Sequence, residues 1–369
     1  MTSNGNSEYS RPADNEIEFS LFGPRYGEST LIHYGNGHWL VIDSCLSLSG
    51  RPAALDYLEK LGVDPKRSVR FVMASHFDDD HIRGLSDILV LCENARFALS
   101  SALSQSEFQA FLKPSMALNA KFPSGVSELA KCLRIVRNRE ANSIVRASAN
   151  KALFREWDGG NLLIEVVALA PSDELVRRTI HNLVNSVPEG PRVRMVFNNN
   201  DLSVVSLIKA GPIQILHGAD LEHRPGGSIG WLGILNDQNR EPINASFYKI
   251  SHHGSESGDH DQIWDEFLDS RTLCALAPFS KGRGIPTEID KNRLLNRGNS
   301  IYSSTKVVRT RFKPTDNTVA RTLKDGRVKM WSSNGLPGQI RFRARKNTTS
   351  NCEVALFEDA CELRSVVTS

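Results

Sequence analysis

Apolar and polar positions in the first hundred residues alternate between the periods of strands and of helices. Residues 37–43 form an apolar run that ends in a carboxylate, as expected of a buried strand. Residues 51–61 repeat apolar side chains every three or four positions, which predicts a helix that ends at Gly62. A second apolar run at 69–74 predicts another strand. A strand–helix–strand unit of this length implies a parallel pair, whose carboxyl ends lie at one edge of the sheet.

The rest of the chain continues this α/β pattern. We expect a helix over 82–95. Residues 104–154 look mainly helical, with a break at 122–125, and predict an insertion that covers the site or the sheet. Further strands are predicted over 162–168, 202–208, 213–216, 247–250 and 273–277, and further helices over 261–268 and 287–295.

The densest chemistry directly follows the strand at 69–74. Residues 76–81 contain two imidazoles and three carboxylates in six positions. Such a cluster would repel itself and lose hydration unless cations neutralised it. An acidic first turn of a helix is the competing interpretation, since Asp favours that position, but it does not account for both histidines. Side chains at alternate positions could converge from a tight loop, so we expect a cradle for two metal ions.

Three further segments carry polar groups beside other predicted strands. Asp220 follows the strand at 213–216 after a turn of small residues, and His252 and His253 follow the strand at 247–250. An amide cluster that includes Asn200 precedes the strand at 202–208. A lone Asp at a strand end is usually a turn residue, and a histidine pair can be structural. Because ligands gather at the carboxyl ends of strands in such sheets, the segments together indicate one site.

These motifs, in this order, resemble the metallo-β-lactamase superfamily, whose signature HxHxDH is followed by later Asp and His ligands. The similarity is greatest to the branch typified by the C-terminal domain of the DNA-uptake protein ComEC and by phosphorylcholine esterases. It covers roughly residues 17–305. Asp78 replaces the second His of the general signature, which this branch allows, and Gly-Ala-Asp stands where Gly-Asp is commoner. The matching motifs are His76-x-Asp78-x-Asp80-His81, Asn200-x-x-Ser203, Gly218-Ala219-Asp220 and His252-His253-Gly254-Ser255.

The resemblance implies a four-layer αββα sandwich with two divalent metal ions. Asp43 would be the strand-end Asp that orients loops in this family without holding metal. Nitrogen and oxygen ligands without thiolate suit Zn²⁺, and an Asp at position 78 makes the site more favourable to Mn²⁺, so both metals stay open. The implied ligands are His76 and Asp78 for one ion, Asp80, His81 and His253 for the other, and Asp220 as the bridge.

The implied reaction is hydrolysis by a metal-bridging hydroxide. Asp80 and His252 are the predicted catalytic residues. His252 could bind a phosphoryl oxygen or protonate the leaving group. A second metal ligand or a support for its neighbour His253 are equally open roles for it. Asn200 is predicted to line the substrate side, whereas His217 is expected to pack near the sheet end.

Charge is unevenly distributed, although the net charge is only +3. Twelve Lys or Arg against two Asp give the span 306–346 a charge of +10, so the remainder sums to −7. Segments 309–313 and 341–345 place cations at alternate positions, and as strands each would present a row of cations on one face. Such rows suit phosphate backbones. A solvated outer sheet face is the alternative.

These observations predict three regions: a flexible N-terminus at 1–15, a metallo-β-lactamase-fold domain at 16–305 and a basic, β-rich extension at 306–369 packed on it. We expect a metal-dependent phosphodiesterase, foremost a DNA nuclease. A hydrolase of small phosphoesters or other esters, a component of a multi-protein DNA-processing or phage-defence system, and a binding module are the alternatives. No apolar run could span a bilayer, no secretion signal opens the chain, and the six cysteines form no CxxC pair, which favours the cytoplasm.

Overall fold

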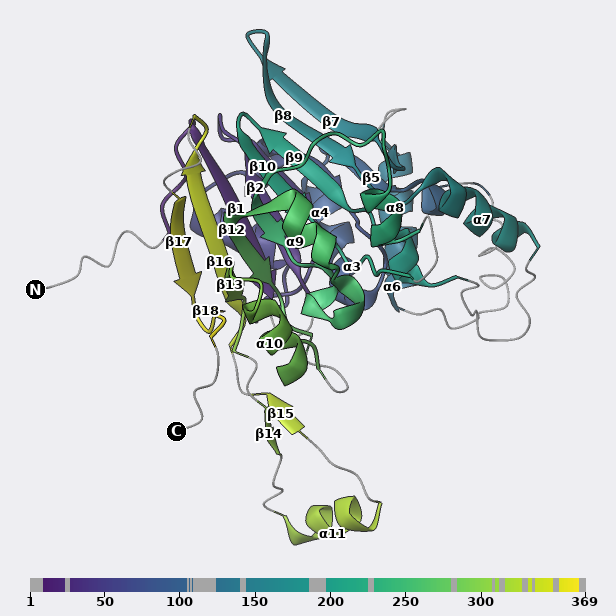
Figure 1. The fold of residues 1–369 in the computed structure, drawn as a ribbon, viewed down its shortest axis with the longest axis vertical. Helices are drawn as coiled ribbons and strands as arrows, with labels where there is room; N and C mark the ends of the chain where they lie inside the picture. Colours follow the sequence, from purple (N-terminus) through teal and green to yellow (C-terminus); the bar gives the residue numbers. More distant parts are fainter. Residues whose placement is uncertain are drawn as a thin grey trace, which may run out of the picture.

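Two facing β-sheets carry the fold (Figure 1). Where the structure describes the chain, no helix is long and apolar enough to cross a membrane. None of the six cysteines forms a disulfide bond. The structure, a computed structural model, describes residues 9–23, 27–104, 106, 108, 124–139, 144–185, 197–224, 229–279, 284–306, 309–311, 316–326, 331–333, 336–347 and 352–364.

Each large sheet has eight strands within the described residues, and each combines parallel with antiparallel pairs. The first sheet runs in the order β17 (Cys352–Phe357), β16 (Gly338–Arg345), β1 (Glu16–Gly23), β2 (Ser29–His33), β3 (Trp39–Ile42), β4 (Val69–Met73), β5 (Arg96–Ser100) and β6 (Ile144–Ala147). The second runs in the order β18 (Cys361–Glu362), β13 (Ser300–Ser303), β12 (Leu268–Leu276), β11 (Ala245–Lys249), β10 (Ile213–His217), β9 (Ser206–Ala210), β8 (Asn161–Ala168) and β7 (Lys151–Asp158).

Helices cover the outer face of both sheets. The first sheet packs against α1 (Ala53–Lys60), α4 (Leu85–Leu91), α6 (Ser124–Arg137) and α7 (Asp173–Val184). The second packs against α8 (Trp231–Leu235), α9 (Asp261–Phe267) and α10 (Glu288–Leu295), which face the viewer in Figure 1. Shorter helical segments are α2 (Pro65–Ser68), α3 (Asp79–Ile82), η1 (Ser101–Ser104), η2 (Asn199–Leu202), η3 (Ser251–Gly254) and η4 (Glu256–Gly258).

The strand period explains the layers. Along β3, Trp39 and Val41 pack against the outer helices, whereas Leu40 and Ile42 pack between the sheets. Alternate side chains of a strand point to opposite faces, so a strand buried on both sides must be apolar throughout. Three separate hydrophobic clusters result, one between the sheets and one under each helical layer. The predicted four-layer αββα sandwich is confirmed.

The expected helical insertion is partly wrong. Within 104–154, residues 105, 107, 109–123 and 140–143 lie outside the described part, and α6 is helical as expected. Residues 144–147 and 151–158, however, form β6 and β7. Both are edge strands, one on each sheet, and exposed residues interrupt their burial pattern. Their short apolar stretches fit a strand as well as a helix, so periodicity alone could not separate the two.

Two element boundaries also differ from the prediction. The helix expected over 82–95 is shorter, since α4 runs only over 85–91, and Gly84 with a left-handed φ of 84° separates it from α3, which ends at Ile82. The strand expected over 202–208 begins only at Ser206, since the chain first forms η2 and then an extended link. That link still joins the sheets, as the Val204 amide donates to the Ser75 carbonyl at 2.8 Å.

The C-terminal segment contributes strands to both sheets. Strand β16 pairs antiparallel with β1, and β18 pairs with β13. Between β13 and β16 in the chain, β14 (Arg309–Arg311), α11 (Asn317–Asp325) and β15 (Trp331–Ser333) form an arm that projects from the sandwich in Figure 1. We refer to residues 306–335 as the arm. Its two ends meet at the sandwich, where the Thr305 hydroxyl donates to the Leu336 carbonyl at 3.1 Å.

The row of cations expected at 341–345 does not lie on an exposed face. Arg341 and Arg343 are buried, and only Arg345 is exposed. Glu18 accepts from Arg343 at 2.7 Å, and Glu353 accepts from Arg341 at 3.2 Å. Strand β16 lies between β17 and β1, and Arg341 and Arg343 each pair with a carboxylate of one of these neighbouring strands, so neither cation is free to form an exposed row.

The predicted flexible N-terminus is described only from residue 9. Residues 1–8 lie outside the described part. Tyr9 stacks on Phe357 with ring centroids 5.2 Å apart, and Arg11 donates to the Leu61 carbonyl at 2.7 Å. The division into regions at residues 15 and 305 stays a prediction.

Candidate metal centre

The candidate centre lies where the carboxyl ends of parallel strands from both sheets meet. In the first sheet β3 runs parallel to β4, and these strands lead into Asp43 and His76. In the second sheet β10 runs parallel to β11, and these lead into Asp220 and His253. Ligands collect at this edge of such sheets. The topology therefore brings together all four strand-end segments that the sequence singled out.

Asp43, at the end of β3, connects the first sheet to residues 75–81 through hydrogen bonds. One carboxylate oxygen accepts from the Ser75 amide at 2.7 Å. The other accepts from the Ser75 hydroxyl at 2.6 Å and from His81 Nδ1 at 2.9 Å. Since His81 donates through Nδ1, its Nε2 is left as the lone-pair nitrogen that a metal requires. Asp43 thus orients a histidine and the loop.

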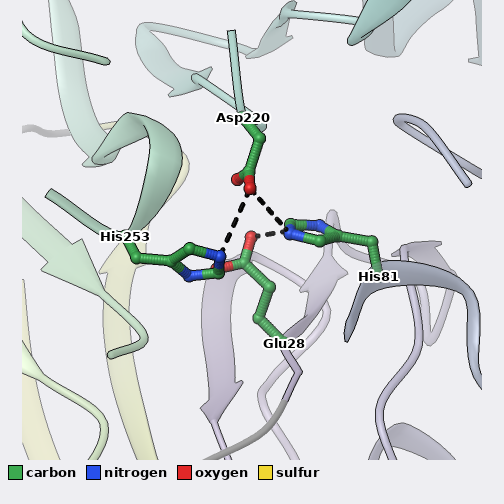
Figure 2. A group of neighbouring side chains, drawn as sticks. All are labelled: Glu28, His81, Asp220 and His253. Atoms are coloured by element: carbon green, nitrogen blue, oxygen red, sulfur yellow. Dashed lines mark ion pairs between the residues drawn. The ribbon is translucent and has the colours of Figure 1, made fainter. Parts of the chain in front are cut away.

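His81 and His253 present Nε2 to the same two carboxylates. Asp220 Oδ2 lies 3.2 Å from Nε2 of each ring, as Figure 2 shows. Asp80 Oδ2 lies 3.1 Å from His253 Nε2 and 3.7 Å from His81 Nε2. His253 Nδ1 donates to the Ala277 carbonyl at 2.9 Å, which fixes its tautomer in the same sense as that of His81. This is one of the two ligand groups that the family resemblance implied.

His76 and Asp78 form the second group. His76 is buried, its ring centroid lies 4.2 Å from that of His81, and its Nδ1 lies 3.0 Å from the Ser75 hydroxyl. Its Nε2 lies 3.8 Å from Asp78 Oδ2. Asp78 is the most exposed of the predicted ligands, with a side chain 40% accessible, and Asn199 donates to it at 2.5 Å. The open side of the centre is therefore at Asp78.

Strained backbone concentrates around the centre. Seven non-glycine residues in the described part have positive φ, and four of them belong to the centre or adjoin its ligands. These four are Asp43 (61°), Ala219 (47°), His252 (45°) and His253 (54°). Such conformations persist only where surrounding contacts enforce them, and they cluster at functional sites. Gly218 before this turn is also tightly enclosed, because a Cβ there would stand 2.2 Å from the Ser251 hydroxyl.

Two charged residues of the centre were not found from the sequence. Glu28 precedes β2 and is buried, with its oxygens 3.5 Å from Nδ1 of His81 and of His253. Lys249, the last residue of β11, is fully buried and its ammonium contacts Glu28. A lysine within an apolar strand was an available signal, since Lys is almost never buried without a partner. Glu28 stands in a polar stretch and gave no comparable signal.

Burial and charge pull the histidine pKa values in opposite directions. Burial, aided by the neighbouring His81, lowers the pKa of His76 to about 4. Burial would also lower the pKa of His81 and His253, but Asp220 and the other carboxylates raise both pKa values well above the usual range. Burial would raise the pKa of Asp220, yet His253 and His81 hold it well below its usual range. The carboxylates of the centre therefore stabilise positive charge at this place.

The buried pair behind the rings is charged as well. Burial alone would raise the pKa of Glu28, but Lys249 and the two histidines lower it to about 2. Burial would lower the pKa of Lys249, but Glu28 and Asp220 raise it. The carboxylate is therefore ionised beside a protonated amine.

His252 lies among polar side chains, next in sequence to the predicted ligand His253. Its Nδ1 lies 2.9 Å from the Ser255 hydroxyl, 3.0 Å from the Ser257 hydroxyl and 3.2 Å from Glu222 Oε1. Its Nε2 lies 3.5 Å from the Asn200 amide nitrogen, which also lies 3.4 Å from Glu222. Asn200 and His252 are thus neighbours, as a shared substrate-side role would require. None of these contacts involves a predicted metal ligand.

His217 is buried and, among the described residues, forms no ion pair or hydrogen bond with a predicted ligand. Its Nε2 is 3.2 Å from the Thr30 hydroxyl. Burial, with Lys249 nearby, lowers the pKa of His217 to about 3, so the ring is neutral. This placement is the packing role expected from the sequence.

The described residues fit a metal cluster. Nε2 of His76, Nε2 of His81 and Asp220 Oδ1 are buried with no hydrogen-bond partner among the described residues. Orphaned polar atoms of this kind are costly unless another group binds them. Both Nε2 atoms face carboxylates, whereas Asp220 Oδ1 lies 3.5 Å from Lys249 Nζ. Glu28, His81, Asp220 and His253 place ligand-type atoms within 4.8 Å of one another. Glu28 differs in facing Nδ1, the ring edge opposite Nε2, and in contacting an ammonium.

Comparison with known proteins gives remote similarities. No family model and no curated protein matches the chain. The metallo-β-lactamase fold protein YhfI from Bacillus subtilis is 12% identical, with 71% of this chain and 86% of that chain covered and a TM-score of 0.35. A metallo-β-lactamase with a HARLDQ motif from Cronobacter sakazakii is 15% identical, with 56% and 63% covered and a TM-score of 0.32. A putative metallo-β-lactamase from Thermotoga maritima is 15% identical, with 53% and 68% covered and a TM-score of 0.27.

All three structures carry the name of the fold class predicted for this chain. Because the identities and TM-scores are low, the function proposed below rests on the chain's own residues. The ComEC-like branch stays a prediction.

Proposed function

We propose that this chain is a metal-dependent hydrolase that cleaves phosphodiester bonds, with nucleic acid, foremost DNA, as its substrate. The observation that carries the proposal is the convergence of three histidines and three aspartates from both sheets at one edge. Their Nε2 atoms lie within 3.8 Å of carboxylate oxygens of the same group. The six residues are His76, Asp78, Asp80, His81, Asp220 and His253.

The charge of the centre supports two divalent cations. Among the described residues, five carboxylates lie within 3.8 Å of His76, His81 or His253, and the Lys249 ammonium contacts one of them. With neutral imidazoles the group carries four formal negative charges, which two divalent ions balance. Buried charge without such balance costs several kcal/mol per ion. The five carboxylates are Glu28, Asp43, Asp78, Asp80 and Asp220.

The cations would activate water at neutral pH and offset charge on a phosphoryl oxygen. The chain's own residues then divide the work. His76 with Asp78 would hold one ion, and Asp80, which was also predicted to act in catalysis, would hold the other with His81 and His253. Asp220 would lie between them. Zn²⁺ and Mn²⁺ both suit these nitrogen and oxygen ligands.

We assign His252 the role of a general acid on the substrate side. Glu222 and two serine hydroxyls engage Nδ1, so Nε2 faces Asn200 and the open side. A histidine oriented in this way can protonate a leaving oxygen. The Asn200 amide can donate to a phosphoryl oxygen beside it. In this proposal His252 and Asn200, which hold no metal, act on the leaving oxygen and on a phosphoryl oxygen of the substrate.

The arm favours a polyanionic substrate. It carries eight Lys or Arg and two Asp, a charge of +6, whereas the buried cations of β16 are already neutralised. The arm leaves the second sheet after β13, which runs parallel to β12, β11 and β10. It therefore starts at the same edge as Asp220 and His253, about 10 Å from the end of β11 across two strand spacings and about 14 Å from the end of β10 across three. Phosphate backbones bind such clusters through counterion release.

Cleavage assays test this function. The full chain, loaded separately with Zn²⁺ and Mn²⁺, is incubated with single-stranded DNA, double-stranded DNA, RNA and bis(p-nitrophenyl) phosphate. We expect metal-dependent cleavage of DNA that D220A abolishes. H252Q should keep its metal and lose about 100-fold or more in kcat. Turnover of the small diester without cleavage of any nucleic acid would instead favour a small-phosphoester hydrolase, and intact substrates throughout would contradict the proposal.

A further inference from the structure

A buried ion pair lies directly behind the histidines of the centre. Glu28 is 1% exposed and Lys249 is 0% exposed, and they contact each other. Burying two charges carries a large desolvation cost, and well-packed apolar residues of similar volume are often as stable. A buried pair beside a functional centre therefore calls for a role beyond stability.

Lys249 holds the turn that carries Asp220. Its Nζ donates to the Ala219 carbonyl at 2.9 Å and lies 3.5 Å from Asp220 Oδ1. Ala219 has a φ of 47°, a conformation that needs such external support. With Oδ1 turned toward the ammonium, Oδ2 of the same carboxylate faces Nε2 of His81 and of His253. One ammonium thereby fixes both the backbone and the side chain of the shared ligand.

Glu28 holds Lys249 in turn. In Figure 2 its carboxylate lies near both rings, in a separate position from Asp220. It does not set the histidine tautomers, because Asp43 and the Ala277 carbonyl accept from the two Nδ1 atoms at 2.9 Å, closer than Glu28 at 3.5 Å. It is also less suited than Asp220 as a metal ligand, because the ammonium that contacts its Oε1 would repel a cation bound to the same carboxylate.

We propose that Lys249, held by Glu28, is a positioning residue of the metal centre. Its ammonium fixes the Ala219–Asp220 turn so that Asp220 Oδ2 faces both histidines. The inference rests on the metal centre of the proposed function and is independent of the substrate. It assigns the pair to ligand geometry rather than to the stability of the sandwich.

Cobalt(II) binding separates these two roles. Metal-free full-length protein is titrated with Co²⁺ alone, with calorimetry for affinity and stoichiometry, visible absorption for ligand geometry, and Tm for stability. K249M leaves Glu28 buried without its partner, so we expect a lower Tm, about 10- to 100-fold weaker Co²⁺ binding and an altered absorption band. The double variant E28Q/K249M removes both charges. It should recover much of the Tm but neither the affinity nor the absorption band.

A remote buried pair provides the control. Glu18 is 0% exposed and pairs with Arg343 in the first sheet. E18Q should lower Tm and leave Co²⁺ affinity unchanged, which separates a general loss of stability from a loss of ligand geometry.

Four outcomes would overturn the inference. Wild-type affinity and absorption in E28Q/K249M would make the pair purely structural. Loss of one Co²⁺ equivalent in a folded E28Q would make Glu28 a ligand. Absence of Co²⁺ binding by the wild-type chain would overturn the metal centre and with it the proposed function, whereas unchanged affinity in K249M would overturn the positioning role alone.

Discussion

At the scale of single residues, the centre depends on side chains that orient the ligands. Asp43 accepts from one amide, one hydroxyl and one imidazole, so a single carboxylate fixes both a loop and a ring. Such partners of ligating histidines hold the ring and raise its basicity. Their removal should therefore weaken metal binding without removing a ligand.

Asp43→Asn tests this dependence. Depending on its orientation, the new amide would present its NH₂ group either to the Ser75 amide or to the Ser75 hydroxyl and His81 Nδ1, which replaces at least one acceptor by a donor. We expect metal affinity to fall about 10- to 100-fold, measured by competition with a chelator of known affinity. Asp56→Asn is the matched control, because Asp56 accepts from Ser47 and Ser49 outside the centre. Equal affinity in the wild type and D43N would contradict the orienting role.

At the scale of elements, the loop that carries His253 is held from outside by helix α10. Arg293 donates to the Gly254 carbonyl at 2.7 Å and to Asp259 at 2.8 Å, and Arg297 donates to Asp259 at 2.9 Å. Burial would raise the pKa of Asp259, but Trp264 and the two arginines lower it. Asp259 thus joins the helix to the ligand loop in its ionised form.

The lowered pKa of Asp259 gives a pH-dependent prediction. A carboxyl with a lowered folded-state pKa stabilises the fold above its unfolded pKa of about 3.9, and this contribution disappears as pH falls through the folded pKa. Asp259→Asn should cost roughly 2 kcal/mol of unfolding free energy at pH 7. The gap to the wild type should narrow below about pH 4. Chemical denaturation of both proteins at pH 7 and below about pH 4 measures this difference in unfolding free energy. A difference that stays constant down to about pH 2 would contradict the prediction.

Elements with a clear hydrophobic period were predictable, and so were the motifs at their ends. Residues 39–42, 69–73 and 213–217 are strands close to the predicted bounds. Edge strands such as β6 were missed, because their short runs lack a distinct period. Lys249 and Glu28 escaped prediction for another reason. Their contact forms only because the two sheets face each other, since Glu28 precedes β2 of the first sheet and Lys249 ends β11 of the second. A local sequence pattern does not record such a contact.

At the scale of the whole molecule, the arm is separable from the sandwich. Its ends meet through Thr305 and Leu336, and strands β16 and β17 continue the first sheet without it. Its charge of +6 stands in contrast to the negative remainder of the chain. This arrangement suggests that substrate retention and bond cleavage reside in different parts of the molecule.

Replacement of residues 306–335 by a Gly-Ser linker tests that separation. We expect an unchanged Tm and unchanged turnover of bis(p-nitrophenyl) phosphate, because the centre and the sheets are untouched. DNA affinity should fall, and its dependence on salt concentration should become less steep, because fewer phosphates are neutralised. Binding curves at several salt concentrations measure both. DNA binding and salt dependence identical to the wild type would exclude the arm as the polyanion site.

The metal content of the purified full-length chain tests the central claim most directly. After exposure to Zn²⁺ or Mn²⁺ and removal of unbound ions, elemental analysis should find about two equivalents of one of these metals per chain. D220A should lose at least one equivalent, while D56N should keep both. A wild-type chain that retains neither metal would contradict the assignment of this edge of the sandwich as a metal centre.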